Sequence, residues 1–354
     1  MRLRRIVPGA LLLVAFAFLP WASSAGATSE DAQVPHFAGP VFLIIGENTQ
    51  LSQLNKGNAP YMLDTLKPSS AWLTNYWATT HYSESNYAAM TSGDFTACEQ
   101  KDGKVTACHQ DIDNLFNQLA NNDKTFLTWS ESMPKPCYLF NTGTDSAQNH
   151  YAAKHNPQLL YDNVEGDIPW TQPGHGTYVI NPDNTGGSFC ASTNVSMGGD
   201  GTQRNDTTLF NDVLTGNAPQ NAPSIADFNL VVPNECEDGH SNCKPEGNPI
   251  TQFDDFLKNE VPLIQDYITA HGGLLLVTFD EGVTSSPKRA VKFGNGGNVM
   301  FAAWGPQVRT GAVYEQGAFT HYSLLRTIED GFGITTYLGK ANDPATHPIY
   351  PIWN

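Results

Sequence analysis

A hydroxyl at the start of a predicted helix is the first candidate for chemistry in this sequence. Within residues 79–93, Ser83 is predicted to cap the helix, Glu84 adds a negative charge to its first turn, and Gly93 ends it. Unpaired backbone N–H groups at such a helix start bind tetrahedral oxyanions such as phosphate, and a hydroxyl held beside them can act as a nucleophile. A structural cap without a catalytic role is the alternative that this stretch leaves open.

Carboxylates directly follow two apolar runs that are predicted to be buried strands. Glu47 comes just after residues 41–45, and the adjacent Asp280 and Glu281 come directly after residues 274–279. In open α/β sheets, functional groups collect at the carboxyl ends of the strands. Two adjacent carboxylates there are unfavourable unless a cation or a proton neutralises them, so these residues predict a metal site.

Another pair of polar residues lies on a short loop after the predicted strand at residues 228–232. Asp238 and His240 are two residues apart, between Cys236 and Cys243. A disulfide across so short a loop would make it rigid, which suits a metal site or an acid/base pair. The spacing alone does not separate these two roles.

Several motifs resemble those of a known family, in the same order along the chain. The run Thr80-His81-Tyr82-Ser83-Glu84-Ser85-Asn86-Tyr87, followed by Ser92-Gly93-Asp94, is similar to the T-H-P-S-x-P-N-Y…G-D signature of a phosphoesterase family. That family contains secreted acid phosphatases and phospholipases C, and its wider relatives form the alkaline phosphatase superfamily. The chain departs from the signature at Tyr82 and Ser85, which stand where the signature has prolines. Further elements that resemble the family are Glu47-Asn48, Pro233-Asn234 with Asp238 and His240, Asp280-Glu281 and Thr320-His321.

The resemblance implies a role for each residue at a matching position. Ser83 would attack phosphorus, with His240 and Asp280 as further catalytic residues. The residues that bind the substrate would be Asn48, His81 and Asn86. The implied metal ligands are Glu47, Asp238, His240, Asp280, Glu281 and His321.

The implied ligand set also bears on the identity of the cation. Glu281 stands where the superfamily has a histidine, and Glu47 replaces a common aspartate. Oxygen ligands favour Ca²⁺, Mg²⁺ or Mn²⁺ over Zn²⁺. A metal-independent site, with a proton shared between Asp280 and Glu281 at acid pH, is the alternative.

The elements that would position these residues alternate along the chain. The predicted strands are at residues 41–45, 71–76, 125–129, 228–232, 274–279 and 299–304, and the predicted helices are at residues 59–66, 111–120, 253–268 and 320–329. This alternation is typical of the α/β class. The resemblance implies an alkaline-phosphatase-like three-layer α/β/α sandwich with a mostly parallel central sheet.

Residues 134–223 show no such pattern and are rich in Gly, Asn, Pro and Thr. We expect this insertion to form long loops over the active face. His150, His155 and His175 lie within it, and we interpret them as loop residues because they lack the spacing typical of metal ligands.

The N-terminus has the features of a signal peptide. Three arginines within the first five residues precede an apolar run at residues 10–19 and the small residues 25–27, which predicts cleavage after Ala27. The run is too short to span a membrane, so no stable membrane insertion is expected. The remaining residues 28–354 would form a single catalytic domain that is secreted or periplasmic.

The cysteines and the net charge narrow the environment and the partners. Two cysteine pairs that are close in sequence, Cys98 with Cys108 and Cys236 with Cys243, predict disulfides and leave Cys137 and Cys190 for each other; free buried thiols are the alternative. A formal net charge of −16 argues against nucleic acids and anionic membranes as partners. A small phosphorylated substrate would therefore need local features, such as a metal or a helix start, for binding.

These observations together predict an exported phosphomonoesterase of the acid phosphatase type that works through a phosphoserine intermediate. A phospholipase C or another phosphodiesterase would use the same site and is the enzymatic alternative. An exported binding protein with a structural cation is the non-catalytic alternative. Nothing in the sequence predicts the oligomeric state.

Overall fold

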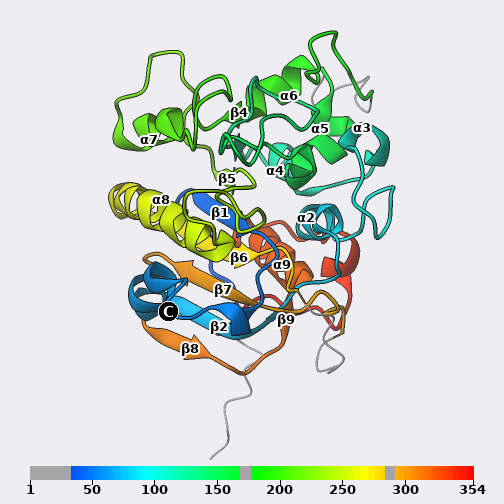
Figure 1. The fold of residues 1–354 in the computed structure, drawn as a ribbon. Coiled ribbons are helices and arrows are strands. Elements are labelled where there is room, and N and C mark those ends of the chain that lie inside the picture. Colours follow the sequence, from blue (N-terminus) through cyan, green and yellow to red (C-terminus); the bar gives the residue numbers. More distant parts are fainter. Residues whose placement is uncertain (1–32, 168–176, 284–291) are drawn as a thin grey trace, which may run out of the picture. The chain divides into compact units, whose positions relative to one another are not determined.

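One mixed sheet brings the ends of distant chain segments together. The structure, a computed structural model, describes residues 33–167, 177–283 and 292–354, which belong to one compact unit, Ala32–Asn354. The strand order is β4-β3-β5-β1-β6-β7-β2-β8, and β9 pairs with β2 (Figure 1). The strands are β1 (Val41–Gly46), β2 (Ala71–Trp77), β3 (Phe126–Ser130), β4 (Asn194–Ser196), β5 (Phe228–Val232), β6 (Leu274–Phe279), β7 (Asn298–Trp304), β8 (Ala312–Tyr314) and β9 (Phe319–Thr320).

The sheet is mostly parallel, as predicted. Among the described strands, only β7 runs antiparallel to its neighbours β6 and β2. At the centre, Val41 of β1 aligns with Phe228 of β5 on one side and with Leu274 of β6 on the other. Because these strands start in register and run in one direction, the residues that follow them emerge at the same edge of the sheet.

Helices cover both faces of the sheet, which confirms the predicted three-layer α/β/α arrangement. In Figure 1, α8 lies on one side of β1 and β6, and α2 and α9 lie on the other. The α-helices are α1 (Lys67–Ser69), α2 (Ser83–Ser92), α3 (Val105–Cys108), α4 (Leu115–Asn121), α5 (Asp162–Glu165), α6 (Ser188–Thr193), α7 (Thr208–Thr215), α8 (Pro249–His271) and α9 (His321–Gly331). Short 3₁₀ or π turns are η2 (Leu51–Gln53), η3 (Met62–Leu66), η4 (Ala153–His155), η5 (Pro157–Leu160) and η6 (Gly339–Asn342).

Aromatic packing joins α8 to the central strands. The ring of Phe253 lies 4.9 Å from that of Phe279 at the end of β6, and Tyr267 lies 6.0 Å from Phe42 of β1. All residues of β1, β5 and β6 are buried, as expected of parallel strands that are covered on both faces. Their continuous apolar runs are the reason that the sequence predicted them with nearly correct bounds.

The insertion at residues 134–223 contains more regular structure than expected. It holds η4, η5, α5, α6 and α7, and β4 extends the sheet by parallel pairing with β3. The insertion is therefore rich in loops but not free of regular structure. These elements are mostly three to eight residues long, too short for a periodic apolar pattern to stand out. His175 lies outside the described residues.

All three predicted disulfides are present: Cys98–Cys108, Cys137–Cys190 and Cys236–Cys243. Among the described residues, no helix is both long and apolar enough to cross a membrane. The predicted signal peptide lies outside the described residues.

Buried acids remote from the strand ends make the stability of the fold depend on pH. Burial raises the pKa of Glu329 in α9 from about 4.5 to about 8 and that of Glu260 in α8 to about 7. The folded state thus keeps protons that the unfolded chain releases above about pH 4.5. This contribution to stability is complete below pH 4.5 and is lost as the pH rises toward 8.

We therefore expect the thermal unfolding temperature to decrease as the pH is raised from 5 to 8.5. Glu329→Gln keeps an acceptor for the backbone N–H of Leu338 and removes the titrating group, so it should raise the unfolding temperature at pH 8.5 by a few degrees. The matched control is Glu315→Gln on the exposed surface, which should leave the pH profile unchanged. An identical pH profile for the wild type and Glu329→Gln would contradict this assignment.

Candidate active site

Ser83 begins α2 at the carboxyl edge of the sheet and is only 2% exposed. Its hydroxyl Oγ donates a hydrogen bond of 2.7 Å to Glu47 Oε2, at the end of β1. Gly93 ends the helix with φ of 72°, as predicted, but the N-cap is Tyr82 and Ser83 is the first helical residue. The predicted cap position was therefore wrong by one residue, and Ser83 still lies among the unpaired N–H groups of the first turn.

Three fully buried carboxylates, Glu47, Asp238 and Asp280, lie near one another here, and Glu47 and Asp280 contact this hydroxyl. Burial, followed by the charges of Asp280 and Asp238, raises the pKa of Glu47 well above its usual value. Burial likewise raises the pKa of Asp238, and burial together with the Glu281 charge raises that of Asp280 to about 7. The cluster thus strongly favours binding of a proton or a cation.

His155 joins two of these carboxylates and was missed by the sequence analysis. Its Nε2 lies 3.5 Å from Glu47 Oε2, and its Nδ1 lies 3.2 Å from Asp238 Oδ2. Its ring stacks on Tyr87 of α2 and lies 5.9 Å from the ring of His240. Burial lowers the pKa of His155 well below its usual value, so the imidazole is neutral. Its spacing could not reveal this position, because its partners come from two other chain segments.

Lys154 supplies positive charge beside the carboxylates and was also missed. Its charge lowers the pKa values of Glu47 and Asp238, although burial outweighs it at both. Lys154 Nζ pairs with Asp102 Oδ2 at 2.8 Å, and Asp102 Oδ1 accepts the backbone N–H of Glu84 at 3.2 Å. The first turn of α2 is thereby tied to a lysine whose charge lowers the pKa of Glu47.

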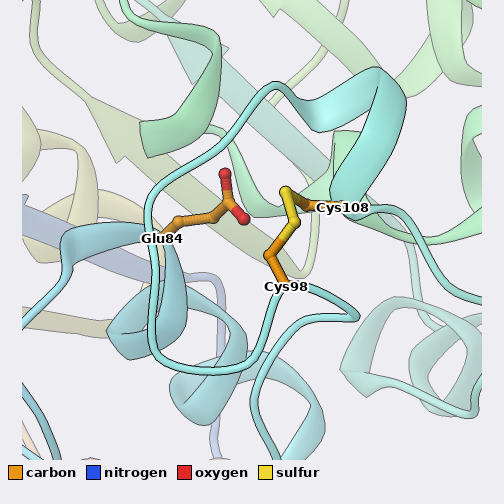
Figure 2. Close-up of side chains that lie close together, drawn as sticks. All are labelled: Glu84, Cys98 and Cys108. Atoms are coloured by element: carbon orange, nitrogen blue, oxygen red, sulfur yellow. A yellow bond between two sulfur atoms is a disulfide. The ribbon is translucent and has the colours of Figure 1, made fainter.

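Glu84, which follows Ser83, points toward the Cys98–Cys108 disulfide (Figure 2). It is fully buried, and burial raises its pKa to about 7. Its Oε2 accepts the backbone N–H of Gly103 in the loop that the disulfide closes. Glu84 therefore anchors this loop over the start of α2, rather than adding a simple negative charge to the helix start as the sequence analysis supposed.

Glu281 lies beside this cluster and braces the segment that precedes Ser83. Its two oxygens accept His81 Nδ1 at 2.7 Å and the backbone N–H of Tyr82 at 3.0 Å. His81 Nε2 is buried without a hydrogen-bond partner, so this nitrogen could contact a substrate.

Tyr82 has φ of 117°, a conformation that is rare for a residue with a side chain. Proline, with φ fixed near −65°, cannot adopt it, so the backbone at this position is incompatible with the proline of the family signature.

Two predicted substrate-binding asparagines also hold the loops of the site. The backbone N–H of Asn48 donates to Asp280 Oδ1 at 3.0 Å. Asn86 Oδ1 accepts the backbone N–H groups of Thr79 and Thr80, each at 3.1 Å, and its Nδ2 donates to the Thr80 carbonyl. The structure thus engages the Asn86 amide with the loop before α2, which favours a positioning role over the predicted contact with phosphoryl oxygens.

His321, a predicted metal ligand, lies behind Asp280. Its Nε2 contacts the Asp280 carbonyl at 2.5 Å, and its Nδ1 contacts the Tyr76 hydroxyl at 3.0 Å. Burial lowers the pKa of His321 to about 4, so the ring is neutral and donates from Nε2. With both nitrogens engaged, His321 positions the segment that carries Asp280 in this arrangement.

The carboxylates fit a hard divalent cation. Glu47 Oε1, Asp238 Oδ2 and Asp280 Oδ2 are buried without a hydrogen-bond partner. Buried acceptors in this state are costly unless a proton or a metal satisfies them. Glu47 and Asp280, with the Ser83 hydroxyl, offer only oxygen donors, which suit Ca²⁺, Mg²⁺ or Mn²⁺.

Comparisons of the sequence with known proteins agree with the motifs. No model of a protein family matches the chain. It is 27% identical over 285 residues to a phosphate-repressible acid phosphatase of Penicillium chrysogenum, covering 78% of this chain and 55% of that protein. A probable acid phosphatase of Kluyveromyces lactis is 27% identical over 332 residues, covering 91% of this chain and 66% of the relative. A phosphatidylinositol-3-phosphatase of Mycobacterium tuberculosis is 23% identical over 320 residues, covering 90% and 84%.

Comparison with solved structures supports the fold. The lipoteichoic acid synthase LtaP of Listeria monocytogenes has a TM-score of 0.50 and 11% identity, covering 88% of this chain and 76% of that one. Ps i-CgsB, solved in complex with a neocarrahexaose, has a TM-score of 0.50 and 14% identity, covering 89% and 76%. The predicted relationship to acid phosphatases and the predicted fold class are confirmed. The chain spans just over half to about two thirds of the length of the two fungal relatives.

Because of the backbone at Tyr82, we expect the proline of the family signature to be harmful in this chain. Tyr82→Pro would force a different φ and remove the N–H that donates to Glu281, and a misfit of this kind costs roughly 1–3 kcal/mol. Tyr82→Gly keeps both the φ and the N–H and is the matched control. Thermal unfolding should show a lower unfolding temperature for the proline variant only. Equal unfolding temperatures for the two variants would contradict the assigned conformation.

Proposed function

We propose that this protein, a homologue of acid phosphatases, is a phosphoester hydrolase that cleaves phosphate monoesters with Ser83 as the nucleophile. The observation that carries the proposal is the 2.7 Å hydrogen bond from Ser83 Oγ to Glu47, made at the start of a helix and among three buried carboxylates. A hydroxyl oriented by an adjacent base beside unpaired N–H groups is the arrangement that phosphoryl transfer needs. A non-catalytic binding protein would not need this orientation.

In the first step, Ser83 Oγ attacks phosphorus and the bond from phosphorus to the leaving oxygen breaks. Glu47 Oε2 is placed to accept the serine proton. The leaving oxygen takes a proton from water or the one that Glu47 has accepted; the neutral His155, 3.5 Å from Glu47, can relay that proton by accepting it at Nε2 and releasing it again, and His240 lies beside it. The N–H groups of the first turn of α2 stabilise the charge on the phosphoryl oxygens, which is usually the largest contribution to such catalysis. The products are an alcohol and phosphoserine.

In the second step, water attacks the phosphoserine and releases inorganic phosphate. The bond between phosphorus and Ser83 Oγ breaks, and the serine regains a proton. By microscopic reversibility, Glu47 and His155 are available to take up the proton that the attacking water loses and to return a proton to Ser83 Oγ. Asn86, Glu281 and His321 do not react in this scheme; they hold Ser83 and Asp280 in place.

We further propose that Glu47 and Asp280 hold a hard divalent cation next to Ser83. Such an ion would offset the repulsion among the carboxylates and the negative charge of the phosphoryl group. Asp238 and His155 complete the cluster on the other side of Glu47.

A terminal phosphoryl group is the substrate that the burial of the site favours. Ser83 is 2% exposed, and a diester would need space for a second substituent on phosphorus. We therefore place monoesters ahead of the phospholipase C reaction. The three disulfides support an exported protein, because such bonds persist in oxidising compartments.

Substitution of the nucleophile is the direct test of the mechanism. Ser83→Ala should lower turnover of an aryl phosphate monoester by several orders of magnitude, while the unfolding temperature stays near that of the wild type. Thr80→Ala is the matched control, since Thr80 is a neighbouring buried hydroxyl that we do not assign to catalysis. Turnover in Ser83→Ala close to wild type would exclude Ser83 as the nucleophile. Faster hydrolysis of a phosphocholine lipid than of the monoester would reverse the substrate preference.

Removal of metal tests the cation. EDTA should inactivate the enzyme, and re-addition of Mg²⁺, Ca²⁺ or Mn²⁺ should restore the activity. Asp280→Asn should abolish activity under all of these conditions, because it removes the charge that the cation or a proton requires. Full activity in EDTA would assign charge neutralisation to a proton shared between Asp280 and Glu281. Tightly bound Zn²⁺ that is lost on Asp280→Asn would contradict the choice of a hard cation.

A further inference from the structure

A second group of polar side chains lies outside the Ser83 cluster, where the insertion meets the loop after β5. Asp145, His150 and Glu235 each direct one ligand atom to a common point, and these atoms all lie within 4.8 Å of one another. His150 Nδ1 is 2.7 Å from Asp145 Oδ1 and 3.0 Å from Glu235 Oε2. His240 Nδ1 lies 3.5 Å from the same Glu235 oxygen. We call these four residues the outer quartet.

The backbone that carries the outer quartet is well restrained. The N–H of Glu235 donates to the carbonyl of His150 at 2.9 Å, which ties the two segments directly together. The Cys236–Cys243 disulfide closes the loop that contains His240. Glu235 is 6% exposed, whereas Asp145 is exposed, so the quartet has one buried end and one end that faces solvent. An ion could therefore reach the quartet without opening the fold.

The donor set distinguishes the outer quartet from ordinary surface acids. Two imidazole nitrogens and two carboxylate oxygens are a combination that suits Zn²⁺ and related first-row ions, whereas the all-oxygen set near Ser83 suits harder ions. Zinc bonds of 2.0–2.2 Å in a tetrahedron place the ligand atoms about 3.3–3.6 Å apart. The separations of 2.7 Å (His150 to Asp145) and 3.0 Å (His150 to Glu235) are close to this range. His240 lies 3.5 Å from Glu235 but outside the group of three whose ligand atoms all lie within 4.8 Å of one another, so its ring would have to turn toward the ion.

We propose that Asp145, His150, Glu235 and His240 form a binding site for Zn²⁺ or a similar first-row divalent ion. The ion would fasten the insertion to the loop that also carries Asp238. Because the ring of His240 packs against His155, the ion would also restrain the imidazole that contacts Glu47. This site is separate from the proposed hard-cation site and does not depend on it.

Without an ion, the same residues satisfy one another as an ion-pair network. The hydrogen bond to Glu235, together with that to Asp145, raises the pKa of His150 to about 9, so a protonated His150 offsets part of the negative charge of the two carboxylates. Zinc would take the place of that proton. The network and the metal site are thus alternative states of one cluster, and binding experiments separate them.

The test measures zinc binding to the full-length, disulfide-bonded protein carrying Asp280→Asn, after chelation and dialysis. The Asp280 change weakens the site near Ser83, so the remaining zinc reports on the outer quartet. We expect one Zn²⁺ per chain by calorimetry and a zinc-dependent rise in unfolding temperature. His150→Gln and, separately, Asp145→Asn should weaken binding by at least about 10–100-fold, the loss that typically follows from removing even a supporting partner of a metal ligand.

A matched control and a second variant keep the proposal falsifiable. His109 forms a similar pair with Asp162 at 2.5 Å but belongs to no group of metal ligands among the described residues, so His109→Gln should leave zinc affinity unchanged. If His150→Gln does not fold, Asp145→Asn, at an exposed position, gives the same information. No saturable zinc binding in the parent protein, or equal affinity in the parent, His150→Gln and Asp145→Asn, would show that the quartet is only an ion-pair network.

Discussion

The burial of three neighbouring carboxylates, one of which accepts the Ser83 hydroxyl, is the constraint on which the rest of the site depends. Glu47, Asp238 and Asp280 are fully removed from solvent, and each carries an oxygen without a hydrogen-bond partner. Burial of this kind opposes folding unless charge is compensated. Backbone N–H groups compensate part of it, since Asp280 Oδ1 accepts from Asn48 and Asp238 Oδ1 accepts from His240. The negative charge that remains suits the site to a cation, which in the proposed mechanism also offsets the charge of the phosphoryl group.

The sheet concentrates these charges because its central strands are parallel and in register. β5, β1 and β6 end at one edge, and β2 runs in the same direction as β6 because both pair antiparallel with β7 between them. Segments that are far apart in sequence therefore meet there, as Asn48 and Asp280 do across 232 residues. Residues that do not face phosphorus maintain the geometry: Asn86 holds the loop before α2, and His321 holds the Asp280 carbonyl. These supporting contacts fix the positions of the reacting groups at this edge of the sheet.

The insertion contributes to the site as well as covering the sheet. η4 places Lys154 and His155 against the carboxylates, and the outer quartet continues the series of acids and imidazoles toward solvent. A strongly acidic protein benefits locally from such cations and imidazoles, because long-range electrostatics would repel an anionic substrate. The loop after β5 is shared, since Asp238 belongs to the Ser83 cluster while Glu235 belongs to the outer quartet. Its disulfide limits how far either side can move.

The amino-acid sequence alone determined the α/β class, the central strands, the disulfide pairs and the carboxylates at the strand ends. The local signals are continuous apolar runs, acids directly after strands, and two short cysteine spacings that leave Cys137 and Cys190 for each other. The tertiary structure decided what no local signal contains. It placed His155 between Glu47 and Asp238, turned His321 and Asn86 to supporting contacts, buried Glu84 under a disulfide-closed loop, and gave Tyr82 a backbone that excludes proline. The physical reason is that these roles depend on partners from distant segments, and only the packing of the sheet, α2 and the insertion brings those partners within contact distance.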